Sequence, residues 1–160
     1  MIAEEVRKKI WKVAFLLLAI AVAYFVKRIP FYIWGHHIEF DPSMSAPMPL
    51  YYKLILGVLI APIFEEALFR GPIYVLVKSK VHILLLLVAI VFWSGAISGF
   101  SHLPNFEEAL PSFWPYYVLI LGLHGLVYGL LVLITKSIWP SVVLHMLANG
   151  NLFVYYYIAN

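Results

Sequence analysis

Six polar side chains in this otherwise apolar sequence have the types that hydrolytic chemistry needs. They lie within or at the end of three apolar stretches and are Glu65, Glu66, Arg70, His102, His145 and Asn149. A glutamate can act as general base on a water molecule, and histidine and asparagine can position that water or donate hydrogen bonds to a developing oxyanion. Together these groups predict a hydrolytic site in an apolar environment.

The spacing of five of these residues predicts which of them share a helix face. Glu66 and Arg70 are four residues apart and can form an ion pair. Glu65 points about 100° away from Glu66 around the helix axis, so Arg70 does not obviously neutralise it. His145 and Asn149 are also four apart and lie on one face. The alternative interpretation is structural: an ion-pair cluster that fixes helix packing, and hydrogen bonds between helices.

His102 stands at the end of its apolar stretch, where a lone histidine is usually a solvated residue. Counted at about 1.5 Å per residue, it lies about 10 Å deeper than the other site residues. We expect it to join them only if its helix tilts, begins later, or bends at Gly95 or Gly99.

Three further features of the apolar stretches concern helix packing. Pro62 stands one turn before the two glutamates and predicts a kink that frees a backbone carbonyl near the site. Gly122, Gly125 and Gly129 predict a close approach of two helices. We interpret His124, between the first two of these glycines, as a packing or interhelical hydrogen-bond residue.

The composition places these stretches in a lipid bilayer. Hydrophobic residues make up 64% of the 160 residues and charged residues 12%, against about 45–50% and 25% in soluble domains. A soluble core of this size cannot hold that excess. The absence of cysteine excludes disulfides, thiolate zinc sites and cysteine nucleophiles, and a net charge of +3 without a basic run on a soluble module argues against a nucleic-acid partner.

Five stretches are long enough to cross a membrane, since a transmembrane helix needs about 17 to 25 residues. We expect them at residues 10–26, 51–77, 81–100, 113–134 and 137–158. The first is a leading helix and not a removed signal peptide, because no small-residue cleavage site follows it. The predicted fold class is therefore all-α: a polytopic membrane helical bundle, forming one membrane domain over residues 1–160.

The basic residues outside these stretches predict an orientation. One side of the membrane would hold Arg7, Lys8, Lys9, Lys12, Lys78, Lys80 and Lys136. The positive-inside rule places that side, with the N-terminus, in the cytoplasm. Because the chain is compact and carries no organelle address, we expect a prokaryotic cytoplasmic membrane.

Two motifs resemble those of the CAAX protease and bacteriocin-processing (CPBP, or Abi) family of intramembrane endopeptidases, which includes the type II CAAX prenyl proteases. EEALFR at 65–70 matches EExxxR, and HMLAN at 145–149 matches HxxxN. His102 is similar in position to the histidine of the family's FxxxH motif, although Ser98 stands where that motif has Phe. The resemblance covers residues 51–153 and implies a four-helix catalytic core at 51–158.

The resemblance implies an endopeptidase that cleaves a membrane-associated peptide or a lipidated, CAAX-like protein within the bilayer. In that family the first glutamate, here Glu65, activates water, and Glu66 and Arg70 support it. The two histidines, His102 and His145, position water or substrate. The asparagine of HxxxN, here Asn149, helps to stabilise the oxyanion.

Family members have been described both as metalloproteases and as metal-free enzymes, and two histidines with a glutamate could hold zinc. We expect no cofactor, since the three residues come from three helices without an HExxH framework. Two alternatives remain: a non-catalytic membrane protein, acting in bacteriocin self-immunity, as a proton relay or as a scaffold for a partner helix, or a degenerate family member inactivated by Ser98. The sequence does not indicate an oligomeric state.

Overall fold

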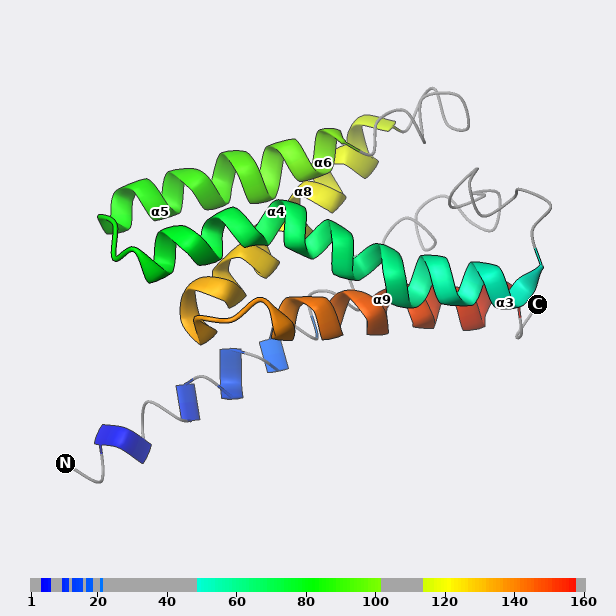
Figure 1. Cartoon of the computed structure of the whole chain (residues 1–160), viewed down its shortest axis with the longest axis horizontal. Helices are drawn as coiled ribbons and strands as arrows, with labels where there is room; N and C mark the ends of the chain where they lie inside the picture. Colours follow the sequence, from blue (N-terminus) through cyan, green and yellow to red (C-terminus); the bar gives the residue numbers. More distant parts are fainter. Residues whose placement is uncertain are drawn as a thin grey trace.

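The computed structural model describes residues 4–6, 10, 11, 13–15, 17, 18, 21, 49–101 and 114–157, and most of these residues are helical (Figure 1). These residues contain no strand, which confirms the all-α prediction. Most of the predicted leading helix at 10–26 lies outside the described residues, and so does His102. The division into a leading helix and a core at 51–158 stays a prediction.

The first long helical segment carries the two glutamates. It joins α3 (Leu50–Lys53), η2 (Leu54–Ile60) and α4 (Ala61–Lys78) without a break. In η2 the backbone widens to π-helical i→i+5 hydrogen bonds, so that the Ala61 N–H donates to the Leu56 carbonyl. Lys80, with a φ of 55°, ends the turn that follows. This segment matches the span predicted at 51–77.

The second segment runs back beside the first and is the most apolar. It joins α5 (Ile83–Ala89), η3 (Ile90–Ile97), which is again π-helical, and α6 (Ser98–Phe100). In the described part of the chain, Ile83–Phe100 is the one helix long and apolar enough to cross a membrane, with a mean hydropathy of 2.4. The predicted count of five spans therefore stays a prediction.

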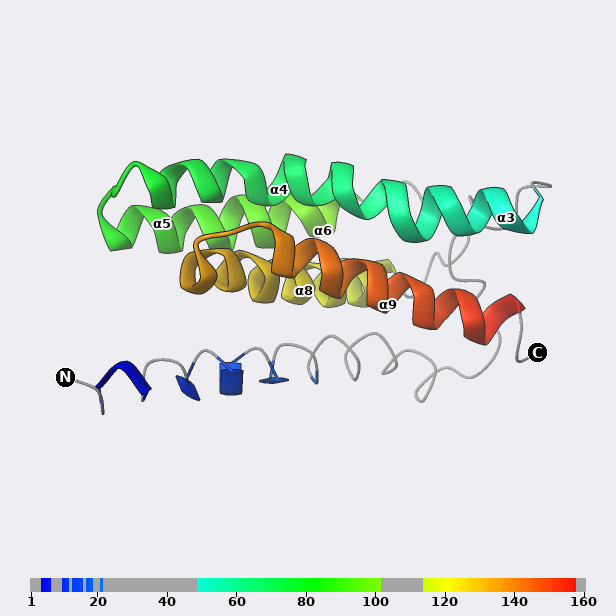
Figure 2. The same cartoon turned by 60° about the horizontal axis from the view of Figure 1, so that its bottom comes forward.

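Two further helices complete the bundle. α8 (Trp114–Thr135) contains a shorter apolar stretch, Leu119–Thr135, and α9 (Trp139–Tyr157) follows after a turn in which Lys136 has a φ of 57°. Figure 2 places this turn at the same end of the bundle as the turn between α4 and α5. The predicted grouping of Lys78, Lys80 and Lys136 on one side is consistent with this arrangement.

The helices enclose a small core and turn much of their apolar surface outward. One buried cluster consists of Ile73, Ile90 and Val132, and another of Tyr128, Leu131 and Leu144. Large apolar side chains on the outer faces are exposed, among them Phe64, Leu84 and Phe92. A soluble monomer rarely exposes such a surface, whereas a bundle surrounded by lipid must. The structure is a helical membrane bundle.

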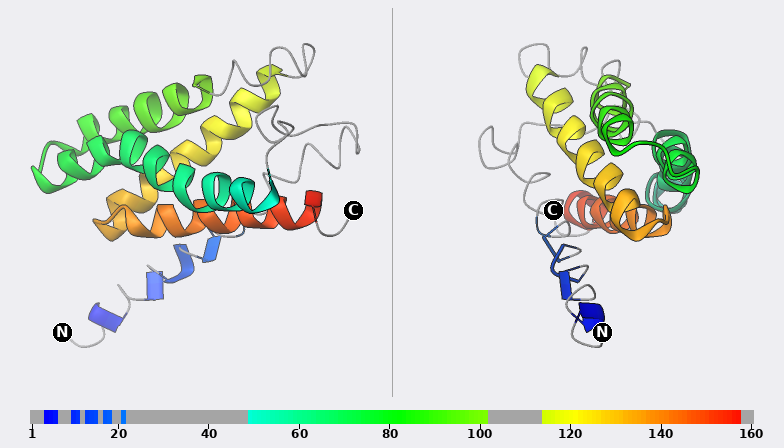
Figure 3. Two further views of the ribbon diagram at one scale, coloured as in Figure 1. Left: turned by 45° about the vertical axis from the view of Figure 1, so that its right-hand side comes forward. Right: turned by 90° about the vertical axis from the view of Figure 1, so that its left-hand side faces the viewer.

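The crossing of η3 and α8 is the tightest contact in the described part of the bundle, and the two helices are seen close together in Figure 3. The Ser94 hydroxyl donates to the Gly125 carbonyl at 2.6 Å. A Cβ atom placed on Gly125 would overlap the Ser94 carbonyl oxygen, and one on Gly129 would meet the Ser94 side chain. The predicted close approach at these glycines is confirmed.

Two prolines leave backbone carbonyls of the first segment without their helical donors. In the i→i+5 register of η2, the donor to the Gly57 carbonyl would be the N–H of residue 62, which is a proline. In the i→i+4 register of α4, the donor to the Leu68 carbonyl would be the N–H of residue 72, which is also a proline. Side chains from other helices supply hydrogen-bond donors to these two carbonyls. The Asn149 amide lies 3.0 Å from the Gly57 oxygen, and the Trp93 indole N–H donates to the Leu68 oxygen at 3.3 Å.

Candidate active site

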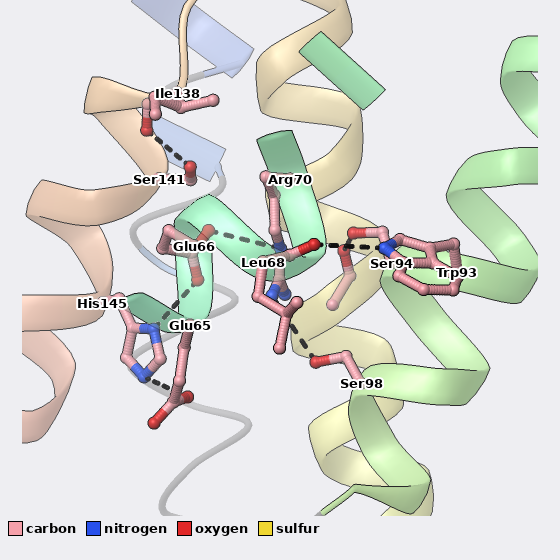
Figure 4. Close-up of polar contacts among 11 residues, drawn as sticks. Glu65, Glu66, Leu68, Arg70, Trp93, Ser94, Ser98, Ile138, Ser141 and His145 are labelled. Carbon is pink, nitrogen blue, oxygen red and sulfur yellow. Dashed lines mark hydrogen bonds and ion pairs between the residues drawn. The ribbon is translucent and has the colours of Figure 1, made fainter. Parts of the chain in front are cut away.

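A buried ion pair forms the base of the candidate site. Glu66 and Arg70 follow each other by one turn of α4, with side chains 0% and 3% exposed. The Arg70 Nε atom lies 3.2 Å from Glu66 Oε2, as their spacing predicts (Figure 4). Because two buried charges without partners would be strongly destabilising, each holds the other in place.

His145, on α9, contacts both glutamates of α4. Its Nδ1 atom lies 2.9 Å from Glu66 Oε1, and its Nε2 atom lies 3.7 Å from Glu65 Oε2. A carboxylate can only accept, so Nδ1 carries a proton in this contact and Nε2 is the nitrogen that faces Glu65. Figure 4 shows the imidazole between the two carboxyl groups.

The two carboxyl groups differ sharply in their access to the surroundings. The Glu65 side chain is 32% exposed, whereas that of Glu66 is completely buried. Consecutive residues of a helix point about 100° apart, which is why one glutamate faces the interior while its neighbour stays accessible. Of the two, Glu65 is the one that a water molecule or a substrate could reach.

Arg70 is also held by two other helices. Its Nη1 atom lies 3.5 Å from the hydroxyl oxygen of Ser98, at the position where the FxxxH motif has Phe. Its guanidinium carbon lies 5.2 Å from the centre of the Tyr128 ring, a cation–π contact. The residue at the unmatched motif position is thus part of the polar cluster.

Tyr128 is a site residue that the sequence pattern did not single out. It is 2% exposed, and its ring centre lies 5.7 Å from that of His145. The available signal was its place four residues after His124, on the same face of α8. His124 is itself buried, which fits a packing role, and its Nδ1 atom lies 3.0 Å from the Ile120 carbonyl oxygen of the same helix.

The two other predicted site residues are Asn149 and His102. Asn149 lies on the face of α9 that carries His145 and contacts the Gly57 carbonyl of η2. His102 lies outside the described residues, so its predicted place in the site stays a prediction. Within the described ranges, no group of three or more histidine, aspartate or glutamate side chains is arranged to hold a metal ion.

Comparison with known proteins identifies the family. The model of the family described as type II CAAX prenyl endopeptidase Rce1-like matches residues 47–151, which is more than half of the chain. The comparisons with curated proteins and with solved structures gave no match. The matched range contains both glutamates, Arg70, His145 and Asn149. The chain therefore belongs to the Rce1-like family of type II CAAX prenyl endopeptidases, as its EExxxR and HxxxN motifs predict.

Proposed function

We propose that this protein is an intramembrane endopeptidase that hydrolyses a peptide bond of a membrane-associated, lipidated substrate with water activated by Glu65. The observation that carries the proposal is the contact of His145 with two unlike carboxyl groups. The accessible Glu65 lies 3.7 Å from one ring nitrogen, and the buried Glu66 lies 2.9 Å from the other. Membership of a protease family supports the same reaction class.

In the proposed reaction Glu65 acts as the general base. The oxygen of a water molecule attacks the carbonyl carbon of the scissile bond while its proton passes to the Glu65 carboxylate. The same proton then goes to the amine nitrogen as the carbon–nitrogen bond breaks. We assign the contact with the attacking water to the Nε2 atom of His145, because this atom faces Glu65 and can accept a hydrogen bond from the water.

Glu66 and Arg70 orient the imidazole in this scheme. The 2.9 Å contact of Glu66 with His145 Nδ1 selects the tautomer and the ring orientation, as second carboxylates do in other histidine-containing sites. Arg70 compensates the buried charge of Glu66. We assign His102 to the positioning of water or substrate and Asn149 to the oxyanion, as their places in the family motifs suggest.

The family name, type II CAAX prenyl endopeptidase, supports a prenylated CAAX protein as the substrate class. The exposed apolar faces of the bundle suit a substrate that arrives within the bilayer. We propose no metal cofactor. We also propose a prokaryotic cytoplasmic membrane as the location. The distribution of lysine and arginine supports an N-terminus on the cytoplasmic side.

The proposal is tested with the purified full chain in liposomes and a synthetic farnesylated peptide that ends in a CAAX sequence. Mass spectrometry should detect release of the three C-terminal residues by the wild-type protein. Glu65→Gln keeps the shape of the side chain and should reduce turnover at least 1,000-fold without changing the unfolding temperature. Glu5→Gln makes the same change at an exposed glutamate of the N-terminal segment and should leave the rate unaltered.

Two results would contradict the proposal. A wild-type chain that does not cleave the peptide would favour the non-catalytic or degenerate alternatives. A Glu65→Gln variant as active as the wild type would show that another group activates the water.

A further inference from the structure

The hydroxyl group of Tyr128 is buried and has no hydrogen bond within the described part of the chain. The residue is 2% exposed, and its phenol oxygen has no hydrogen-bond partner among the residues that the structure describes. Buried tyrosine hydroxyls usually find a partner, because an unsatisfied polar group loses its hydration without compensation. A phenylalanine would fill the same space without that loss, so packing alone does not explain a tyrosine here.

The position of the ring connects this hydroxyl with the candidate site. Tyr128 contacts two site residues that come from different helices: its ring centre is 5.2 Å from the guanidinium carbon of Arg70 and 5.7 Å from the ring centre of His145. The polar groups around it are already engaged with one another. Arg70 contacts Glu66 and Ser98, and Glu66 contacts His145.

A neutral phenol in this place has the properties of an oxyanion donor. Groups that stabilise a developing negative charge act most strongly where water is excluded and where they are held in place before the reaction. Tyr128 meets both conditions, because the residue is buried and its ring contacts Arg70 and His145. A donor without an acceptor in the free protein does not have to break a hydrogen bond before it meets the substrate.

We propose that Tyr128 is a further catalytic residue, whose hydroxyl donates a hydrogen bond to the oxygen of the scissile carbonyl as negative charge develops there. This inference rests on the proposed function, since it requires a peptide carbonyl next to His145. The ring has a separate role, because its contact with Arg70 supports the buried ion pair and does not need the hydroxyl.

Replacing Tyr128 by phenylalanine separates the hydroxyl from the ring. In the farnesylated-peptide assay, Tyr128→Phe should lower kcat about 100-fold and change KM less than threefold, the pattern of an interaction made in the transition state. Its unfolding temperature should equal or exceed that of the wild type, because the substitution removes an unsatisfied buried group. Tyr74→Phe, the same change at a half-buried tyrosine of α4 outside the site, should leave kcat, KM and stability unaltered.

The outcomes distinguish this inference from the proposed function. An active wild type that Glu65→Gln inactivates, together with a fully active Tyr128→Phe, would overturn the inference alone. A Tyr128→Phe variant that loses activity together with thermal stability would also overturn it, because the hydroxyl would then be structural. A wild type without peptidase activity would overturn both.

Discussion

The side-chain amide of Asn149 lies 3.0 Å from the backbone carbonyl oxygen of Gly57, across 92 positions of sequence. In the i→i+5 register of η2 this carbonyl would pair with the N–H of residue 62, which is Pro62 and has none. The asparagine of the HxxxN motif thus supplies the donor that the proline omits. The contact ties α9 to the segment that leads into the two glutamates.

This relationship predicts that the loss of stability caused by replacing Asn149 depends on whether residue 62 is a proline. Asn149→Ala removes the side-chain donor from the carbonyl of the half-buried Gly57 and should reduce the free energy of unfolding by about 1 kcal/mol. In a Pro62→Ala background, the backbone N–H of residue 62 can take over, so the same substitution should cost less. Thermal unfolding of the four proteins in detergent measures the coupling. Equal costs in both backgrounds would show that the proline and the asparagine act independently.

Replacing Glu66 should mainly reduce stability, whereas replacing Glu65 should mainly reduce activity. Glu66→Gln leaves the Arg70 charge buried without compensation and should cost about 3–5 kcal/mol of unfolding free energy. Glu65→Gln affects a side chain that is 32% exposed, and its 3.7 Å contact with His145 contributes about 1 kcal/mol or less. Thermal unfolding in detergent compares the two. Equal losses of stability would contradict the assignment of Glu66 to support and Glu65 to chemistry.

The crossing of η3 and α8 should tolerate no side chain at Gly125. A Cβ atom there would overlap the Ser94 carbonyl oxygen, and backbone on both sides cannot easily yield. Gly125→Ala should destabilise the bundle by about 1–3 kcal/mol or more. Gly71→Ala is the control, because a Cβ atom on Gly71 meets nothing within 4 Å, and it should be neutral or stabilising by up to about 1 kcal/mol. Similar unfolding temperatures for the two variants would contradict the close approach.

Relationships within one helix could be predicted from spacing. Residues four apart share a helix face, so the pairing of Glu66 with Arg70 and the different direction of Glu65 follow from the sequence. The tight crossing at Gly125 could be predicted for a similar reason, since only small residues let two backbones approach.

Contacts between distant segments could not be predicted in this way. His145 contacts Glu66 across 79 positions, and helical periodicity does not say which carboxylate an imidazole will meet. The π-helical register of η2 was not anticipated, because the spacing arguments assume 3.6 residues per turn. A site role for Tyr128 could not be predicted, because tyrosine near the ends of apolar stretches is common at membrane interfaces.

The proposal that no metal cofactor takes part in the reaction can be tested directly. We expect the peptidase activity to survive prolonged dialysis against EDTA and the addition of 1,10-phenanthroline, because the proposed mechanism lets Glu65 activate water on its own. The assay is repeated after Zn²⁺ is added back, with a known zinc protease as the positive control for chelation. Loss of activity that Zn²⁺ restores would identify the site as a metal site.

Ser98, at the unmatched motif position, should give this protein higher stability and a higher kcat than the phenylalanine of the family pattern. Ser98 is 4% exposed, and its hydroxyl oxygen lies 3.5 Å from Arg70 Nη1. A phenyl ring would need the space that the guanidinium occupies, so Ser98→Phe should cost about 1–3 kcal/mol of unfolding free energy through overpacking and lower kcat. Ser98→Ala removes the 3.5 Å contact with Arg70 and should keep most of the activity. A Ser98→Phe variant that gains activity would instead identify the natural chain as a degenerate member of its family.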